Sequence, residues 1–158
     1  MYEPMVRRRL SLFSLLLVLV VAAAGCQFFS SDKKVSADHA RFERIVQAVE
    51  ALRVAYETHN LDVIRKLTLP LKGFQQFEVQ IQRDFDTYPT IALNVTIERI
   101  QIQRDRIKVN VRWEGAWQRS PQDTPVTDQG HGVWVWSGTK DILLASVEGA
   151  TPFGKAGR

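Results

Sequence analysis

The sequence has little cysteine and little histidine, and these shortages limit the disulfides and metal sites that the protein can form. Its 158 residues include a single cysteine, Cys26, so the chain cannot form an internal disulfide. The three histidines, His39, His59 and His131, lie far apart, and no two have the spacing of zinc ligands. We therefore expect no metal site and no cofactor.

The sequence also lacks an apolar run of the usual membrane-spanning length. The apolar run Leu10–Ala24 has 15 residues and no charge, whereas a helix needs about 20 apolar residues to cross a bilayer. It follows three consecutive arginines, Arg7–Arg9, and ends in small residues. This order is typical of a secretory signal occupying residues 1–25. A plain transmembrane anchor is the alternative.

Net charge gives no sign of a nucleic-acid partner. The formal charge is +4, but residues 1–25 carry three arginines and one glutamate, so it falls to +2 without them. The remaining chain has no run of lysine and arginine with interleaved aromatic residues. We expect no binding to nucleic acid.

The end of the apolar run, Ala23-Ala24-Gly25-Cys26, resembles the lipobox of bacterial lipoproteins. The resemblance implies cleavage between Gly25 and Cys26 and acyl chains on Cys26, through which the protein would bind a membrane. Each buried acyl CH₂ contributes about 0.8 kcal/mol, so several chains anchor durably. The resemblance also implies the periplasmic face of the outer membrane, because Gln27 stands where an Asp would favour the inner membrane.

The first part of the remaining chain predicts a polar tether followed by helices. Apolar residues recur at spacings of three and four after the tether, which indicates a helix. The third segment fits either a helix or a strand, and the helical spacing accounts for more of its apolar residues. The predicted elements are a tether over 26–37 and helices over Asp38–His59, Leu61–Leu69 and Leu71–Tyr88.

After Pro89 the apolar period changes to two, which predicts antiparallel strands with one wet face. The alternation slips near Glu98-Arg99, so we expect a bulge there. The predicted strands cover 91–102, Ile107–Trp117, His131–Gly138 and Asp141–Glu148, with a loop over Ser120–Gly130. Helices followed by a meander indicate an α+β fold with helices on one sheet face.

Three segments resemble the NTF2-like (SnoaL-like) superfamily, a cone of curved antiparallel sheet closed by N-terminal helices. They are the helix pair Asp38–Leu69, the long strand Ile107–Trp117 and the ending Ile142–Gly154. The resemblance implies an NTF2-like domain over 38–158. In this ending we expect Phe153 to be buried and Lys155–Arg158 to be loose.

The resemblance implies that an enzyme of this superfamily would place an acid or base inside the cone. We therefore ask whether any inward strand position carries a titratable side chain. These positions carry no titratable group: they are Ile91, Leu93, Val95, Ile97, Ile107, Val109, Val111 and Trp113. General acid–base catalysis needs a titratable group near the reacting proton. We therefore predict a non-catalytic ligand-binding or protein-interaction module and not an enzyme. The alternative is a small isomerase or dehydratase that uses His131 or Glu148.

Aromatic residues are the remaining candidates for contact with an apolar ligand or an envelope protein. Trp134 and Trp136 share a strand face to which the sequence assigns no partner, and they belong either to the core or to an aromatic binding surface. The candidate contact residues are Trp113, Trp134, Trp136, Tyr56 and His131.

Overall fold

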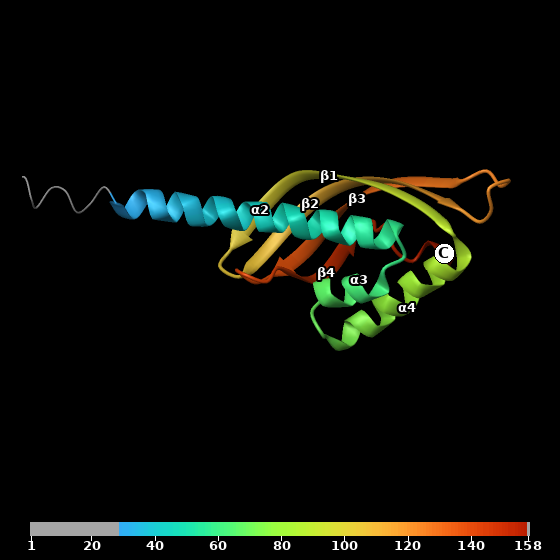
Figure 1. Cartoon of the computed structure of the whole chain (residues 1–158), viewed down its shortest axis with the longest axis horizontal. Helices are drawn as coiled ribbons and strands as arrows, with labels where there is room; N and C mark the ends of the chain where they lie inside the picture. The colour runs from blue at the N-terminus through green and yellow to red at the C-terminus, as the bar shows by residue number, and fades with distance from the viewer. Residues whose placement is uncertain (1–28, 158) are drawn as a thin grey trace, which may run out of the picture. The chain divides into compact units, whose positions relative to one another are not determined.

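The computed structural model describes residues 29–157, and it confirms an α+β fold in which helices precede a curved antiparallel sheet (Figure 1). The helices are α2 (Phe29–Glu57), α3 (Leu61–Leu67) and α4 (Lys72–Thr87). The strands are β1 (Thr90–Gln103), β2 (Arg106–Gln118), β3 (Val126–Ser137) and β4 (Leu143–Gly149), followed by the short 3₁₀ helix η1 (Lys155–Gly157). The chain divides into two units, residues 1–40 and 41–158, and the second contains the sheet.

The helices differ from prediction mainly at their ends. Helix α2 begins at Phe29, so the segment predicted as a polar tether is helical from there on, because it contains no Gly or Pro that would interrupt a helix. Helix α3 ends at Leu67, since Thr68 pairs with Leu144 of β4 instead. The Asn60 side chain caps α3 by accepting a hydrogen bond from the Val63 amide at 3.1 Å.

The sheet is a meander in which each strand pairs with its neighbour in the chain, in the order β1-β2-β3-β4. The predicted bulge is present, because the pairing shifts between Ile97 and Arg99. Strand β3 begins at Val126, earlier than the predicted His131, so part of the predicted loop is strand. The long strand β2 causes this difference, since its final residues pair with Val126 and the residues that follow it.

One face of the sheet and the apolar side of the helices form the core. Ile45 and Leu52 of α2 are fully buried, as are Ile107, Val109 and Val111 of β2. The predicted inward positions on β1 and β2 are all buried or half-buried. Each large apolar side chain buried in this way contributes about 1.5–3 kcal/mol.

Trp134 and Trp136 lie on this inner face, so the interpretation that their face has no partner is wrong. Both are 0% exposed. The strand register explains why: Trp134 lies opposite Val109, and Trp136 lies opposite Ile107. These two tryptophans are core residues, and substituting them would test folding rather than recognition.

Candidate functional site

A buried pair of titratable residues, Tyr56 of α2 and Asp84 of α4, lies inside the cone. Asp84 is 0% exposed, and its Oδ2 accepts a hydrogen bond from the Tyr56 hydroxyl at 2.6 Å. The Trp117 indole N–H donates in turn to the Tyr56 oxygen at 3.0 Å. Burial, followed by the charge of Asp84, raises the pKa of Tyr56, so its hydroxyl remains protonated and acts as a donor.

The rest of Asp84 is occupied by the backbone of the C-terminal segment, residues 151–157. The Gly154 amide donates to Oδ2 at 2.6 Å, and the Ala156 amide donates to Oδ1 at 2.7 Å. Together with Tyr56 these amides give the carboxylate three donors, two of them on one oxygen. The described contacts therefore make Asp84 an anchor for this segment, because its acceptor capacity serves the protein itself.

The C-terminal segment closes the cone with an aromatic ring. Phe153 is 1% exposed, which confirms the prediction that it is buried. Its ring meets Tyr56 edge-on at 4.9 Å and Phe77 at 5.2 Å between centroids. The prediction that the chain becomes loose at Lys155 is wrong, because residues 155–157 form η1 and Lys155 pairs with Asp128. Arg158 lies outside the described residues.

Two tryptophans and a charged pair form what we call the mouth cluster: Trp113, Trp117, Asp128 and Lys155. The Lys155 ammonium nitrogen lies 5.5 Å from the Trp113 ring centroid and 5.1 Å from that of Trp117. The two indole planes are nearly perpendicular, at 83°, with centroids 6.3 Å apart. Because the faces of aromatic rings attract cations, both rings stabilise the ammonium group.

Two glycines give these indole rings their place on the sheet. A Cβ at Gly115 would lie 2.7 Å from Trp117 Cζ3, and one at Gly130 would lie 2.9 Å from Trp113 Cζ2. Real Cβ atoms do not approach that closely, so a side chain at either position would push a ring away. The glycines therefore let the tryptophans lie flat against the strands.

The candidate acid–base residues of the strands lie outside the cone. The His131 side chain is 69% exposed and lies 3.5 Å from a Glu98 carboxylate oxygen. Glu148 is exposed and pairs in register with Val133, on the face opposite Trp134. Neither side chain reaches the core, because the face of β3 that carries Trp134 is the inner one.

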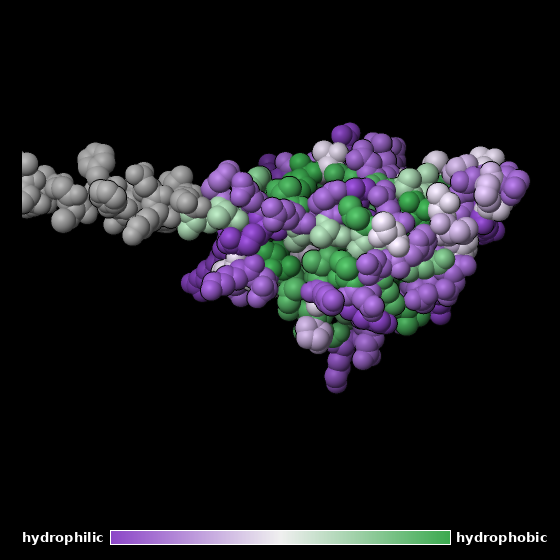
Figure 2. Space-filling view, viewed as in Figure 1, coloured by the Kyte–Doolittle hydropathy of each residue, from purple (hydrophilic) through white to green (hydrophobic). Residues whose placement is uncertain are grey.

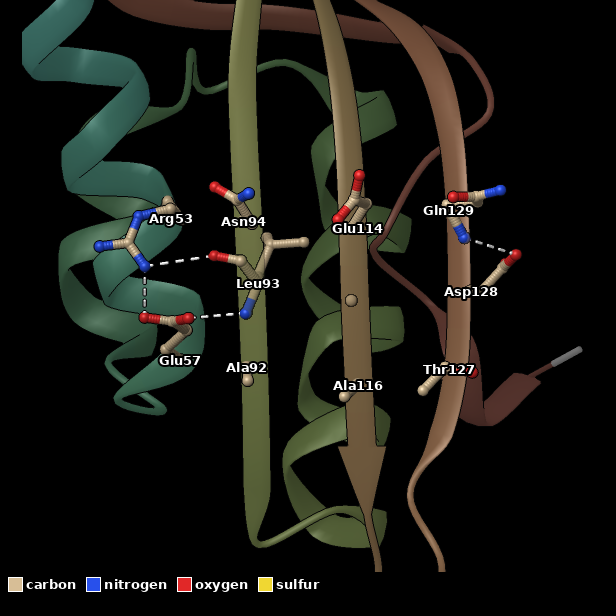
Figure 3. Close-up of a pocket in the computed structure, with 11 residues that line it drawn as sticks. Arg53, Glu57, Ala92, Leu93, Asn94, Glu114, Ala116, Thr127, Asp128 and Gln129 are labelled. Carbon is tan, nitrogen blue, oxygen red and sulfur yellow. Dashed lines mark hydrogen bonds and ion pairs between the residues drawn. The ribbon is translucent and has the colours of Figure 1, made fainter.

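A hollow with a volume of about 850 Å³ lies on the outer side of the sheet (Figure 3). Asn94, Glu114 and Gln129 form a row across β1, β2 and β3, beside the small residues Ala92 and Ala116. The hollow is open, and Arg53 and Glu57 of α2 also line it.

An ion pair on α2 closes part of the free edge of β1 beside this hollow. Glu57 accepts a hydrogen bond from the Leu93 amide at 2.6 Å, and Arg53 donates to the Leu93 carbonyl at 3.2 Å (Figure 3). Arg53 also bonds Glu57 and Glu50. The pair therefore gives Leu93 the two bonds that a neighbouring strand would supply.

The helical face carries exposed apolar side chains among polar ones. In Figure 2 this face shows apolar surface toward its middle and polar surface around it. Phe42, Val46 and Val54 of α2 and Val79 of α4 are exposed apolar residues of these helices. Within residues 29–157, no helix is apolar enough along its length to span a membrane, and no three potential metal-ligating side chains cluster.

Asp84 is the residue that sequence reasoning missed. It lies three residues after Ile81 and four before Tyr88, both buried, so it occupies the apolar stripe of its helix. A carboxylate at such a position is the available signal of a buried polar contact. The lipidation and cleavage residues, Cys26 and Gly25, lie outside the described residues.

Solved structures with the same architecture include NTF2-like proteins. A conserved protein from Planctomyces limnophilus is 15% identical, with a TM-score of 0.61 over 69% of this chain and 97% of its own. A candidate dehydratase of the NTF2-like family from Streptomyces avermitilis is 14% identical, with a TM-score of 0.62 over 70% and 95%. An NTF2-like superfamily protein from Salmonella enterica is 11% identical, with a TM-score of 0.59 over 73% and 93%.

These similarities establish the fold alone. No protein-family model and no curated protein sequence matches the chain. The chain spans nearly the whole length of each of the three solved structures. The sheet and helices therefore have an NTF2-like fold, while the chemistry of the chain depends on its own residues.

Proposed function

We propose that this protein is a lipid-anchored protein of the cell envelope whose NTF2-like domain is a non-catalytic binding or interaction module. The observation that carries the proposal is the bonding of Asp84 inside the cone. A general base must be within hydrogen-bond reach of the proton it removes. The oxygens of Asp84 are instead engaged by Tyr56 and by two amides of the C-terminal segment.

The filled interior supports the same proposal. Trp113, Trp117 and Trp134 are at most 1% exposed, and Phe153 of the C-terminal segment packs against Trp134 with ring centroids 5.5 Å apart. A substrate would have to displace this segment before reaching Asp84. The exposed surfaces, namely the hollow across β1–β3 and the apolar residues of α2, remain open to an envelope protein.

The anchor rests on the sequence near Cys26. A short apolar run, a small-residue end and one cysteine are the features of a lipoprotein signal. We expect the mature chain to begin at Cys26 with acyl chains attached. We also expect it to lie on the periplasmic face of the outer membrane, because residue 27 is Gln and not Asp.

Membrane fractionation with mass spectrometry tests the anchor. Cys26→Ser should release the protein from membranes or leave the signal uncut, whereas Ser31→Ala should change neither. Gln27→Asp should move the protein from the outer to the inner membrane fraction. A mature N-terminus other than residue 26 would contradict the anchor proposal.

An isomerase or dehydratase is the second candidate, and the buried Tyr56–Asp84 pair is the observation that favours it. The likeness to a candidate dehydratase from Streptomyces avermitilis adds only the fold. Complementation of a deletion strain distinguishes the two functions. A binding module should keep its role in the variant Asp84→Asn, provided that circular dichroism shows a native fold. A folded variant that fails to complement would favour the enzyme.

A further inference from the structure

The mouth cluster has the composition of a site that recognises ammonium groups. Trp113 and Trp117 present two nearly perpendicular rings, and Asp128 adds a carboxylate from β3. An aromatic face attracts a cation through its quadrupole, and a carboxylate bonds the ammonium hydrogens directly. The Asp128 carboxylate would repel an anion, so both features favour a cation.

The walls of this site are held in place without Lys155. The Trp113 indole N–H donates to the Ala150 carbonyl at 3.1 Å, and the Trp117 N–H donates to the Tyr56 hydroxyl. Gly115 and Gly130 leave room for the rings against the sheet. The Asp128 carboxylate accepts a hydrogen bond from the Gln129 amide at 2.8 Å. Removing the lysine side chain should therefore leave the two rings in position and this bond intact, so the site is preorganised.

The present occupant is part of the chain itself. The Lys155 side chain is only 11% exposed, and its ammonium group contacts Asp128 and both rings. The lysine stands on η1, a helix of three residues. Two of the bonds that hold this part of the chain are the amide bonds to Asp84.

We propose that Trp113, Trp117 and Asp128 form an ammonium-binding site that Lys155 occupies from within the chain. Once Lys155 is displaced, the site takes the ammonium group of a small soluble amine. The proposal deepens the proposed function and rests on it, because it names the ligand class of a binding module. It gives Lys155 the role of a competitor, so the free protein binds such amines weakly.

Tryptophan fluorescence of the full-length protein, purified in a maltoside detergent without an ammonium group, tests the proposal. Lys155→Ala removes the side chain and should bind n-butylammonium saturably, at least tenfold more tightly than the wild type. Lys155→Met is the matched control, because it keeps the space filled without the charge and should not bind. Adding Asp128→Asn to Lys155→Ala should weaken binding at least tenfold.

Neutral n-butanol separates recognition of the charge from filling of an apolar space. Equal binding of n-butanol and n-butylammonium by Lys155→Ala would overturn the proposal, as would equal amine binding by Lys155→Met. If Lys155→Ala is largely unfolded, n-butylammonium should raise its unfolding midpoint and n-butanol should not. Absence of both binding and stabilisation also overturns it. These measurements use purified protein, so they leave the membrane anchor and complementation to be judged separately.

Discussion

The buried Tyr56 hydroxyl donates a hydrogen bond to Asp84 and accepts one from the Trp117 indole. Its pKa is raised in the folded state, so between pH 10 and that higher value only the unfolded chain releases the proton. Below about pH 10 both states hold the proton and the effect vanishes. The free energy of unfolding should therefore fall as pH rises above about 10.

The contribution of Tyr56 to this decline has a limiting size of about 1.4 kcal/mol per pH unit. The variant Tyr56→Phe lacks the titrating group and should lose stability less steeply over the same range. Urea unfolding of both proteins from pH 9 to pH 11 measures the two slopes. Equal slopes would show that the hydroxyl titrates normally in the fold.

Gly115 makes a second prediction at the residue scale. The variant Gly115→Ala places a methyl group 2.9 Å from Trp117 Cζ2, so the ring must move and its bond to Tyr56 must weaken. Overpacking of this kind costs about 1–3 kcal/mol. Gly73→Ala is the control, because nothing lies within 4 Å of the added carbon, and the helix should gain about 0.5 kcal/mol. Thermal unfolding compares the two variants, and equal midpoints would contradict the ring's dependence on Gly115.

Single residues show where prediction from the sequence stopped. The inward positions of β1 and β2 were predictable, because alternation places every second side chain on one face. The face of Trp134 was not, since both faces of β3 are apolar and only the register with β2 decides between them. Asp84 was not predicted as buried either, because its partners lie at residues 56, 154 and 156.

The helices and strands lie where the periodicity of apolar residues predicts them, but the start of one strand differs because its neighbouring strand is long. Strand β3 gained residues from the predicted loop because β2 extends beside them. Strand β1 lies at the edge of the sheet, where unpaired backbone groups can pair with a strand of another chain. At Leu93 this pairing is blocked, because Glu57 bonds the backbone amide and Arg53 bonds the carbonyl.

The role of this ion pair can be tested by substituting Glu57. Glu57→Ala removes the acceptor of the Leu93 amide, and a partly exposed bond to a charged group contributes about 1.5 kcal/mol. Hydrogen exchange at Leu93 should become faster, and the free energy of unfolding should fall by about that amount. Glu50→Ala is the control, since Glu50 bonds Arg53 but not Leu93, and its effect should stay within about 0.5 kcal/mol. Unchanged exchange in Glu57→Ala would mean that the pair does not protect the edge.

At the scale of the whole molecule, the sheet is built from contacts between neighbouring strands, whereas helix α2 bonds residues that are distant in the sequence. Every strand pairs with the next strand in the chain. Helix α2, by contrast, bonds residues far along the sequence: Arg41 donates to the Gly138 carbonyl, and the Tyr56 hydroxyl lies 3.3 Å from the Pro152 carbonyl oxygen. The fold class was predictable from element order, but the closure of the cone depends on contacts that no local pattern encodes.

A truncation separates these two kinds of contact. A chain ending at Gly149 keeps all four strands but loses Phe153, Lys155 and the two amides that bond Asp84. Hydrogen exchange in α4 should rise strongly, while exchange in the β1–β2 hairpin should change least. A chain ending at Gly157 should resemble the full-length protein. Equal protection of α4 in both truncated chains would show that residues 150–157 do not hold the cone closed.

The bonding of Asp84 to Gly154 and Ala156 also sets an order of events during synthesis. A chain that is made from its amino end delivers α2 and α4 long before residues 154 and 156. The meander can pair strand by strand as it emerges, since neighbouring strands need only short loops to meet. The contacts of the helices with this segment have to wait until residue 156 has been made. The sheet can therefore form while the chain is still growing, whereas the cone closes only when nearly the whole chain is available.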